Sequence, residues 1–195
     1  MISPRRLASI GCAVVSLVAA GPAHAISLSF LPTEGSVALG NTIDVDVIVS
    51  GLGASGSPSL GDFDLDIAYD ETLLQLVSVS FGGLLGTPGV DTLNHASVAA
   101  PGLLDLAEVS LLAAFTLDAL QPSSFALATL SFTALDFGTS ALDFAEALAG
   151  DALGAPLLVA PAASGAVRIV PEPATLLLAG AGLAVLAGLR GRVRS

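Results

Sequence analysis

The feature that most limits the fold of this 195-residue chain is a strict alternation of apolar and acidic side chains at residues 62–67. Phe63, Leu65 and Ile67 alternate there with aspartates, and residues 43–49 repeat the pattern with isoleucine and valine. A period of two places all the apolar side chains on one face of a β-strand, whereas a helix would distribute them around its axis. Both segments are therefore predicted to be strands with one buried and one hydrated face.

Much of the sequence between residues 26 and 170 has the composition of short strands separated by Gly, Pro and Ser turns. Leu76 and Val77 break the alternation in one of them, which indicates a bulge or a strand that is covered on both faces. A helical turn is expected at residues 114–120 and a long loop at residues 82–102. The predicted fold is all-β, a single sandwich of about eight or nine strands. The expected strands are residues 26–30, 43–49, 63–69, 74–81, 103–112, 125–134, 141–144, 157–160 and 166–170.

The N-terminus reads as a secretory signal. Two arginines precede an apolar stretch at residues 7–20, and a small-x-small sequence from Ala23 to Ala25 follows it. This order is typical of a signal peptide that is removed during export, so residues 1–25 are assigned to a signal helix. Cleavage after Ala25 is favoured over an uncleaved anchor, and it leaves residues 26–169 as the folded domain.

The C-terminus combines a short motif, an apolar run and a basic end. Pro171, Glu172 and Pro173 precede sixteen apolar residues at 174–189. Sixteen residues form a helix of roughly 24 Å, and local thinning of a bilayer core of roughly 30 Å can absorb the difference. A transmembrane helix is therefore predicted, with an ordinary tail anchor or a buried helix as alternatives. The basic residues that stop it and favour a cytoplasmic C-terminus are Arg190, Arg192 and Arg194.

This three-part order at residues 170–195 resembles the PEP-CTERM sorting domain of Gram-negative bacteria. The resemblance implies export, transient anchoring in the inner membrane and processing near the Pro-Glu-Pro motif by an exosortase. It identifies Pro171, Glu172 and Pro173 as the sorting motif and the terminal arginines as the membrane stop. Bacteria with this tag make exopolysaccharide, so a role at the cell surface or in the extracellular matrix is expected, with exopolysaccharide as a candidate partner.

The predicted domain is strongly acidic. Between residues 26 and 170 the sequence has sixteen acidic side chains and one basic side chain, Arg168, for a formal charge of −15. Such a surface is expected to repel nucleic acid and anionic lipid, because phosphate binding needs clustered Lys and Arg. The same residues contain no cysteine, which excludes a disulfide framework. Most of the acids are expected to be solvated charge.

One acidic segment is a weak candidate for calcium, which takes six to eight oxygen ligands. An EF-hand loop would need Gly and Glu where Ile67 and Leu73 stand. The acids are therefore assigned to the hydrated face of a strand, and no cofactor is expected. The calcium candidates are Asp62, Asp64, Asp66 and Asp70, to which Asp44 and Asp46 could add oxygens if their strands pair.

No catalytic residues are assigned. His95 is the single histidine after the predicted cleavage site, and it falls in the expected loop at 82–102. A hydrolytic triad needs an activated nucleophile, but the sequence has no Gly-x-Ser-x-Gly elbow, and a zinc site would lack partner His or Cys residues. An enzyme is therefore not expected. The absence of Trp and the single Tyr69 weaken direct carbohydrate binding without removing it.

Three segments resemble in order the cohesin-like family of nine-stranded jelly rolls: residues 37–47, residues 63–70 together with 73–79, and residues 125–132. This family is related in fold to some carbohydrate-binding modules. The resemblance implies a jelly-roll sandwich and favours binding over catalysis. True cohesins bind dockerins, but nothing in this sequence points to a dockerin, so that partner is not transferred. A carbohydrate- or protein-binding module is the alternative function.

Overall fold

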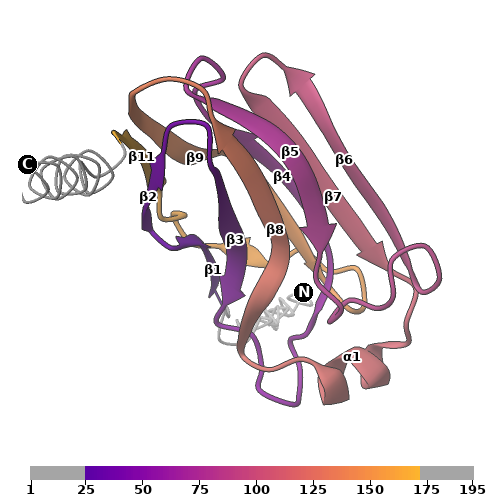
Figure 1. Ribbon diagram of the computed structural model, residues 1–195. Coiled ribbons are helices and arrows are strands. Elements are labelled where there is room, and N and C mark those ends of the chain that lie inside the picture. The colour runs from indigo at the N-terminus through magenta and orange to yellow at the C-terminus, as the bar shows by residue number, and fades with distance from the viewer. Residues whose placement is uncertain (1–24, 172–195) are drawn as a thin grey trace, which may run out of the picture.

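Two β-sheets face each other in the computed structural model, which describes residues 25–171 (Figure 1). One sheet has five strands and the other has six, and neighbouring strands are antiparallel except in the pairs β1/β10 and β2/β11. The five-stranded sheet contains, in order, β10 (Leu158–Val159), β1 (Ala25–Leu31), β3 (Thr42–Ser50), β8 (Ser124–Ala134) and β5 (Leu74–Phe81). The six-stranded sheet contains β2 (Glu34–Ala38), β11 (Gly165–Val170), β9 (Gly138–Asp151), β4 (Leu60–Ala68), β7 (Leu103–Ser110) and β6 (Thr92–Ala100).

The core lies between the sheets, where the alternating side chains of β3 and β4 meet. Leu65 and Ile67 of β4 are fully buried, as the period-two pattern predicts. The rings of Phe30 and Phe144 stack at 4.4 Å between centroids and join the two sheets. Complete burial of each such side chain contributes about 1.5–3 kcal/mol, so this layer supplies most of the driving force for the sandwich.

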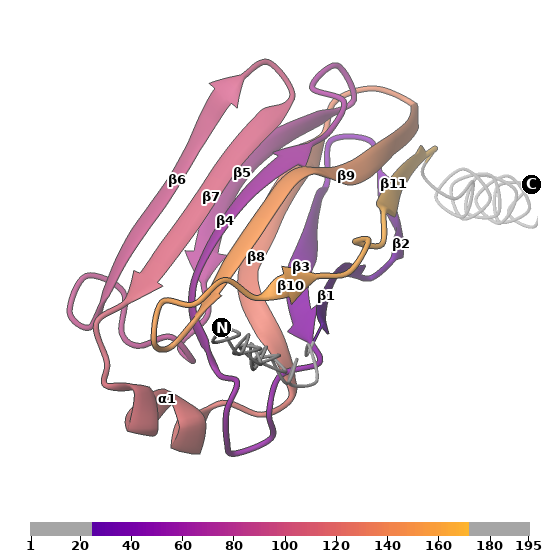
Figure 2. The same cartoon turned by 180° about the vertical axis from the view of Figure 1, so that it is seen from behind.

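The two long sides of the sandwich are closed differently. β1 and β2 are separated only by Pro32 and Thr33, yet they lie in different sheets, and β10 and β11 divide in the same way. On that side the chain therefore passes between the sheets at β1/β2, β2/β3, β9/β10 and β10/β11. The opposite side is bounded by two free edge strands, β5 and β6 (Figures 1 and 2).

The predicted sandwich is confirmed, and so are most of its strands. The expected helical turn is the α-helix α1 (Ala114–Leu120), and the register of β5 shifts between Leu76 and Ser78, which confirms the bulge. The structure has eleven strands rather than eight or nine. The two additional strands are β2, which forms where the chain crosses between the sheets after β1, and β6.

The expected loop at 82–102 is wrong, because it contains the nine-residue strand β6. β6 is an edge strand that is exposed on both faces, so its sequence has no alternation to detect. The expected short strand at 141–144 is part of the fourteen-residue β9, whose alanines and register shift hide its period. β2 is not among the expected strands, because it is short and has Gly35 at its second position, and glycine is more typical of turns.

The two predicted terminal helices fall outside the described residues, apart from Ala25, which begins β1. The same holds for Ala23, for Glu172 and Pro173, and for the terminal arginines. Within residues 25–171 no helix has both the length and the hydropathy that a membrane span requires.

Candidate functional site

The outer face of the six-stranded sheet carries a row of three carboxylates. Asp66 of β4 lies directly opposite Asp105 of β7 on one side and Glu146 of β9 on the other. Cβ atoms of directly opposed residues in a sheet are only about 4.5–5.5 Å apart, and like charges there repel. Within residues 25–171 the carboxylates of Asp66 and Glu146 accept no side-chain hydrogen bond, and the Asp105 carboxylate has His95 Nε2 at 3.9 Å, so the row is positioned mainly by strand pairing. Asp64, next along β4, is exposed beside it.

An apolar area adjoins this acidic row. Leu93 of β6 lies opposite Val109 of β7, and Leu148 of β9 lies opposite Asp64. All three apolar side chains are exposed. The outer face of β6, β7, β4 and β9 thus has an acidic centre and an apolar end, and small residues such as Ala107 between them keep it flat.

The calcium candidates do not converge on one point. Asp62, Asp64 and Asp66 follow the outer face of β4, as expected, but Asp70 lies in the turn after it. There its Oδ1 accepts hydrogen bonds from the Thr72 hydroxyl, at 2.6 Å, and from the Thr72 amide, which lower the pKa of Asp70. Among the described residues no three His, Cys, Asp or Glu side chains are grouped as metal ligands.

The suggested contribution of Asp44 and Asp46 to that site is wrong, because their strand belongs to the other sheet. They lie on β3 and pair with β8 instead. Asp46 accepts a 2.6 Å hydrogen bond from Thr129, and Asp44 accepts one from Ser131. Sequence cannot reveal this pairing, because alternation defines the face of a strand but not its neighbour.

His95 lies on β6 beside a serine and an aspartate, but the geometry is not that of a catalytic triad. Its Nε2 atom is 3.0 Å from the Ser97 hydroxyl and 3.9 Å from the Asp105 carboxylate. A triad needs one ring nitrogen for the nucleophile and the other for the orienting acid, whereas both groups here approach the same nitrogen. All three side chains lie on the outer face of the sheet.

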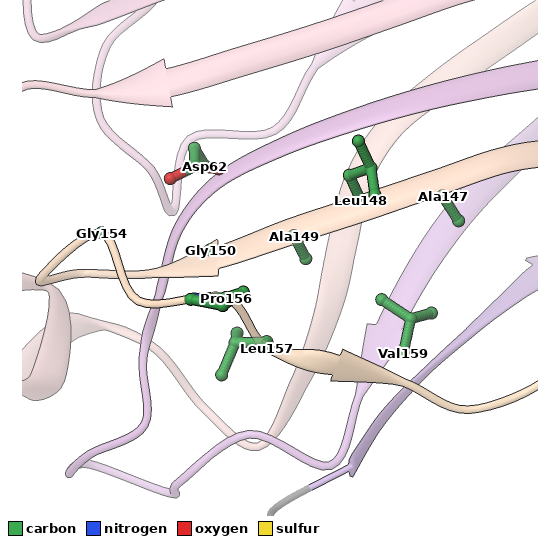
Figure 3. A pocket seen from close by; sticks show the side chains of 9 residues that line it. All are labelled: Asp62, Ala147, Leu148, Ala149, Gly150, Gly154, Pro156, Leu157 and Val159. Atoms are coloured by element: carbon green, nitrogen blue, oxygen red, sulfur yellow. The ribbon is translucent and has the colours of Figure 1, made fainter.

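A pocket of about 470 Å³ opens between the end of β9 and the segment 154–159 (Figure 3). The side chains that line it are apolar apart from Asp62, which lies near Gly150 in the figure, and backbone atoms supply further polar surface. Burial and the nearby charge of Asp151 raise the pKa of Asp62, and the Gly150 amide opposes this effect. The pocket can accept a small apolar group that presents a donor to the Asp62 carboxyl. The sequence does not predict this pocket, because it forms only where the chain turns at residues 151–155 and folds back against the end of β9.

Glu108 is an exception to the expectation that most of the acids are solvated. It lies on the inner side of β7, is 1% exposed, and neither of its carboxyl oxygens has a hydrogen-bond partner. Burial raises the pKa of Glu108, and the adjacent Thr92 hydroxyl opposes this, although it does not reach hydrogen-bond geometry. The spacing to Leu104 and Leu106 was the available signal, since residues two and four apart share a strand face.

Comparison with known proteins identifies the end of the chain separately from the domain. Residues 170–194 match the PEP-CTERM protein-sorting motif. The chain carries a PEP-CTERM tag. Such a tag implies export and processing by an exosortase. The match starts at Val170, the last residue of β11, so the tag follows the sheet without a spacer. No curated protein matches the chain.

The domain is similar to solved cohesins. A cohesin of Acetivibrio cellulolyticus scaffoldin B, in complex with the Cel5 dockerin, has 20% identity and a TM-score of 0.60 over 75% of this chain and 99% of its own. CaCohA2 of Clostridium acetobutylicum has 20% identity and a TM-score of 0.61, over 77% and 94%. A non-cellulosomal cohesin of Archaeoglobus fulgidus has 17% identity and a TM-score of 0.56, also over 77% and 94%. The domain that precedes the PEP-CTERM tag therefore has the cohesin fold.

Proposed function

We propose that this is an exported, non-enzymatic protein of the cell surface or extracellular matrix, whose cohesin-fold domain binds another protein. The PEP-CTERM tag supports the delivery part of this proposal. The chain would be anchored briefly in the inner membrane of a Gram-negative cell and then processed by an exosortase. Removal of residues 1–25 and of the tag would leave the sandwich as the mature protein.

The observation that carries the binding part is the outer face of β6, β7, β4 and β9. Its acids oppose one another across the strands, so they are available to a partner rather than used within the sheet. The apolar area around Leu93 and Val109 supplies contact surface beside this charge. A partner with Lys or Arg next to apolar side chains is complementary to both parts. Several of the similar cohesins were solved in complex with dockerins, which adds weight to a protein partner.

Photocrosslinking in the native host tests this proposal. A photoreactive residue at Ala107 stands in the centre of the proposed face, and one at Thr133, on the outer side of β8, serves as the control. We expect a discrete protein adduct from position 107 alone, and its loss when Asp66→Asn and Asp105→Asn are combined. Adducts of equal yield from both positions, or none from position 107, would contradict the proposed face.

Exopolysaccharide association is the second part of the proposal, and it rests on the tag rather than on the domain. Sedimentation of the mature protein with exopolysaccharide from the host measures it. Calcium is not required by the proposed mechanism. Calorimetric titration with Ca²⁺, compared between the protein and an Asp64→Asn variant, would reveal a contribution from the β4 acids.

Mass spectrometry of the protein from its host tests processing. A chain that begins at Ile26 and ends near Pro171–Pro173 is expected. A chain that ends at Ser195 would mean that the tail is a permanent anchor.

A further inference from the structure

The end of the sandwich from which the tag leaves is formed by the last residues of β11 and by two turns beside them. β11 ends at Val170, which pairs with Ala38 of β2, while Ile169 pairs with Gly138 of β9. The β2–β3 turn and the β8–β9 turn therefore flank the point at which the chain leaves the sheet. Figures 1 and 2 show both turns at the same end of the sandwich as the end of β11.

These two turns expose three large apolar side chains. Leu39 is 38% exposed, Leu135 47% and Phe137 51%. We call this group the exit tip. Its only acid is Asp136, whose carboxylate accepts a 2.7 Å hydrogen bond from the Phe137 amide. Further acids, Asp70 and Glu71, lie on the neighbouring β4–β5 turn.

The exit tip is held together by backbone hydrogen bonds. The Gly40 amide donates to the carbonyl of Ala134, at 2.9 Å, and the Ala134 amide donates to the carbonyl of Asn41, at 3.0 Å. The Leu135 amide donates a hydrogen bond of 2.8 Å to the carbonyl of Leu73 in the β4–β5 turn. Since the turns are joined in this way, their apolar side chains form a fixed surface rather than independent loops.

The short length of chain between β11 and the apolar run limits how far the exit tip can lie from the membrane. Only Pro171, Glu172 and Pro173 separate Val170 from the apolar run that starts at Ala174. Four residue steps span at most about 14 Å when fully extended. The headgroup layer on each side of a bilayer is about 5–8 Å thick. While the apolar run is in the membrane, the end of β11 therefore lies no more than about 14 Å from the hydrocarbon core, in the headgroup layer or just outside it.

We propose that the exit tip is a membrane-contact surface, which inserts Leu39, Leu135 and Phe137 into the lipid interface while the tag is anchored. This inference rests on the membrane intermediate of the proposed function. Phe and Leu side chains on a fixed surface are suited to the boundary between headgroups and acyl chains. Asp136, Asp70 and Glu71 disfavour an anionic surface, so neutral, zwitterionic lipid is the matching chemistry. The contact fixes the height of the Pro-Glu-Pro motif at the interface.

Fluorescence quenching in vesicles tests this contact. A chain that runs from Ile26 to Ser195, and so lacks the predicted signal peptide with Cys12, receives one new cysteine, Leu39→Cys. This cysteine is labelled with an environment-sensitive fluorophore, and Leu135 and Phe137 stay in place. The matched control is Leu153→Cys, in the turn at the far end of β9. Fourteen strand residues separate the two ends of β9 by roughly 45 Å. Leu153 is 83% exposed, so exposure alone would favour the control.

In phosphatidylcholine vesicles that contain shallow nitroxide lipids, we expect a blue shift and strong quenching for the label at position 39 only. Adding Phe137→Ser should reduce that quenching, and Leu135→Ser is a second variant for the same purpose. Equal quenching at positions 39 and 153, in chains that sediment with vesicles, would overturn the contact but leave the anchored intermediate intact. A chain that does not sediment with vesicles would overturn both the contact and the membrane step of the proposed function.

Discussion

The two outer faces of the sandwich carry aspartates in the same alternating pattern, but the two faces use them differently. On the five-stranded sheet, Asp46 of β3 accepts a 2.6 Å hydrogen bond from Thr129 of β8, and Ser50 and Ser124 are bonded at 2.7 Å. On the six-stranded sheet, Asp66 of β4 has Asp105 and Glu146 as its cross-strand neighbours. On the first face the carboxylates accept hydrogen bonds from hydroxyl groups of the neighbouring strand. On the second face the Asp66 carboxylate has other carboxylates as its cross-strand neighbours, so it is free to bind a partner.

This difference shows that aspartates in the same alternating pattern can either stabilise the sheet or remain available to a binding partner, depending on the residues of the neighbouring strand. A carboxylate that accepts a hydroxyl hydrogen bond adds to the stability of the sheet. A carboxylate that opposes another carboxylate subtracts from it. Acids in the second arrangement are more easily explained by binding than by folding, which is why the proposed function uses that face.

The largest expected effect concerns Glu108, the acid of β7 that faces the core while Asp105 faces outward. Burial raises the pKa of Glu108 above the ordinary value of 4.5. The contribution of the neutral carboxyl to folding stability is therefore fully present below pH 4.5, and it is lost as pH rises through the folded-state pKa and the buried group ionises. Glu108→Gln should therefore stabilise the protein by about 1–3 kcal/mol at pH 8, and by much less at pH 5. Urea unfolding at the two pH values measures this.

Asp105→Asn on the outer side of the same strand is the control for Glu108→Gln. Its effect should be small at both pH values, because Asp105 is partly hydrated. If Glu108→Gln were equally neutral at pH 8, the carboxyl would have to be solvated in solution, and the contrast between the two sides of β7 would be lost.

A smaller effect is expected on the five-stranded face. Asp46→Ala removes the acceptor of the Thr129 hydroxyl and should cost about 1 kcal/mol of unfolding free energy. Thr129→Val removes the donor and should cost a similar amount. In the double variant the two losses should not add, because both remove the same hydrogen bond. Additive losses in urea unfolding would show that this hydrogen bond does not stabilise the sheet.

The sequence was sufficient to predict the face on which each aspartate lies, but not its neighbours. Alternation at residues 62–67 correctly assigned Asp64 and Asp66 to the outer face, because period two is a local property of a strand. The residues opposite Asp66 come from strands far along the chain and depend on the register of the whole sheet. For the same reason, the sequence left open whether the strand of Asp44 and Asp46 pairs with β4, and in the structure it does not.

Strand β6 illustrates the second limit. It completes the acidic face and carries His95 and Ser97, but it was predicted to be a loop. An edge strand beyond the opposing sheet buries little, so its side chains are not selected to alternate. The C-terminal tag was the opposite case, because motif, apolar run and arginines are adjacent in sequence and need no tertiary context to be recognised.

The smallest expected effect is a change in the free energy of unfolding that has opposite signs on the two faces. Asp66→Asn removes one member of the carboxylate row, so the protein should become more stable by about 0.2–0.5 kcal/mol at low salt. The gain should shrink as salt is added, because the repulsion that it relieves is exposed and screened. Asp46→Ala destabilises at every salt concentration, since its hydrogen bond does not depend on screening in this way. A loss of stability on Asp66→Asn would mean that this carboxylate stabilises the sheet. The argument that the acidic row serves to bind a partner would then fail.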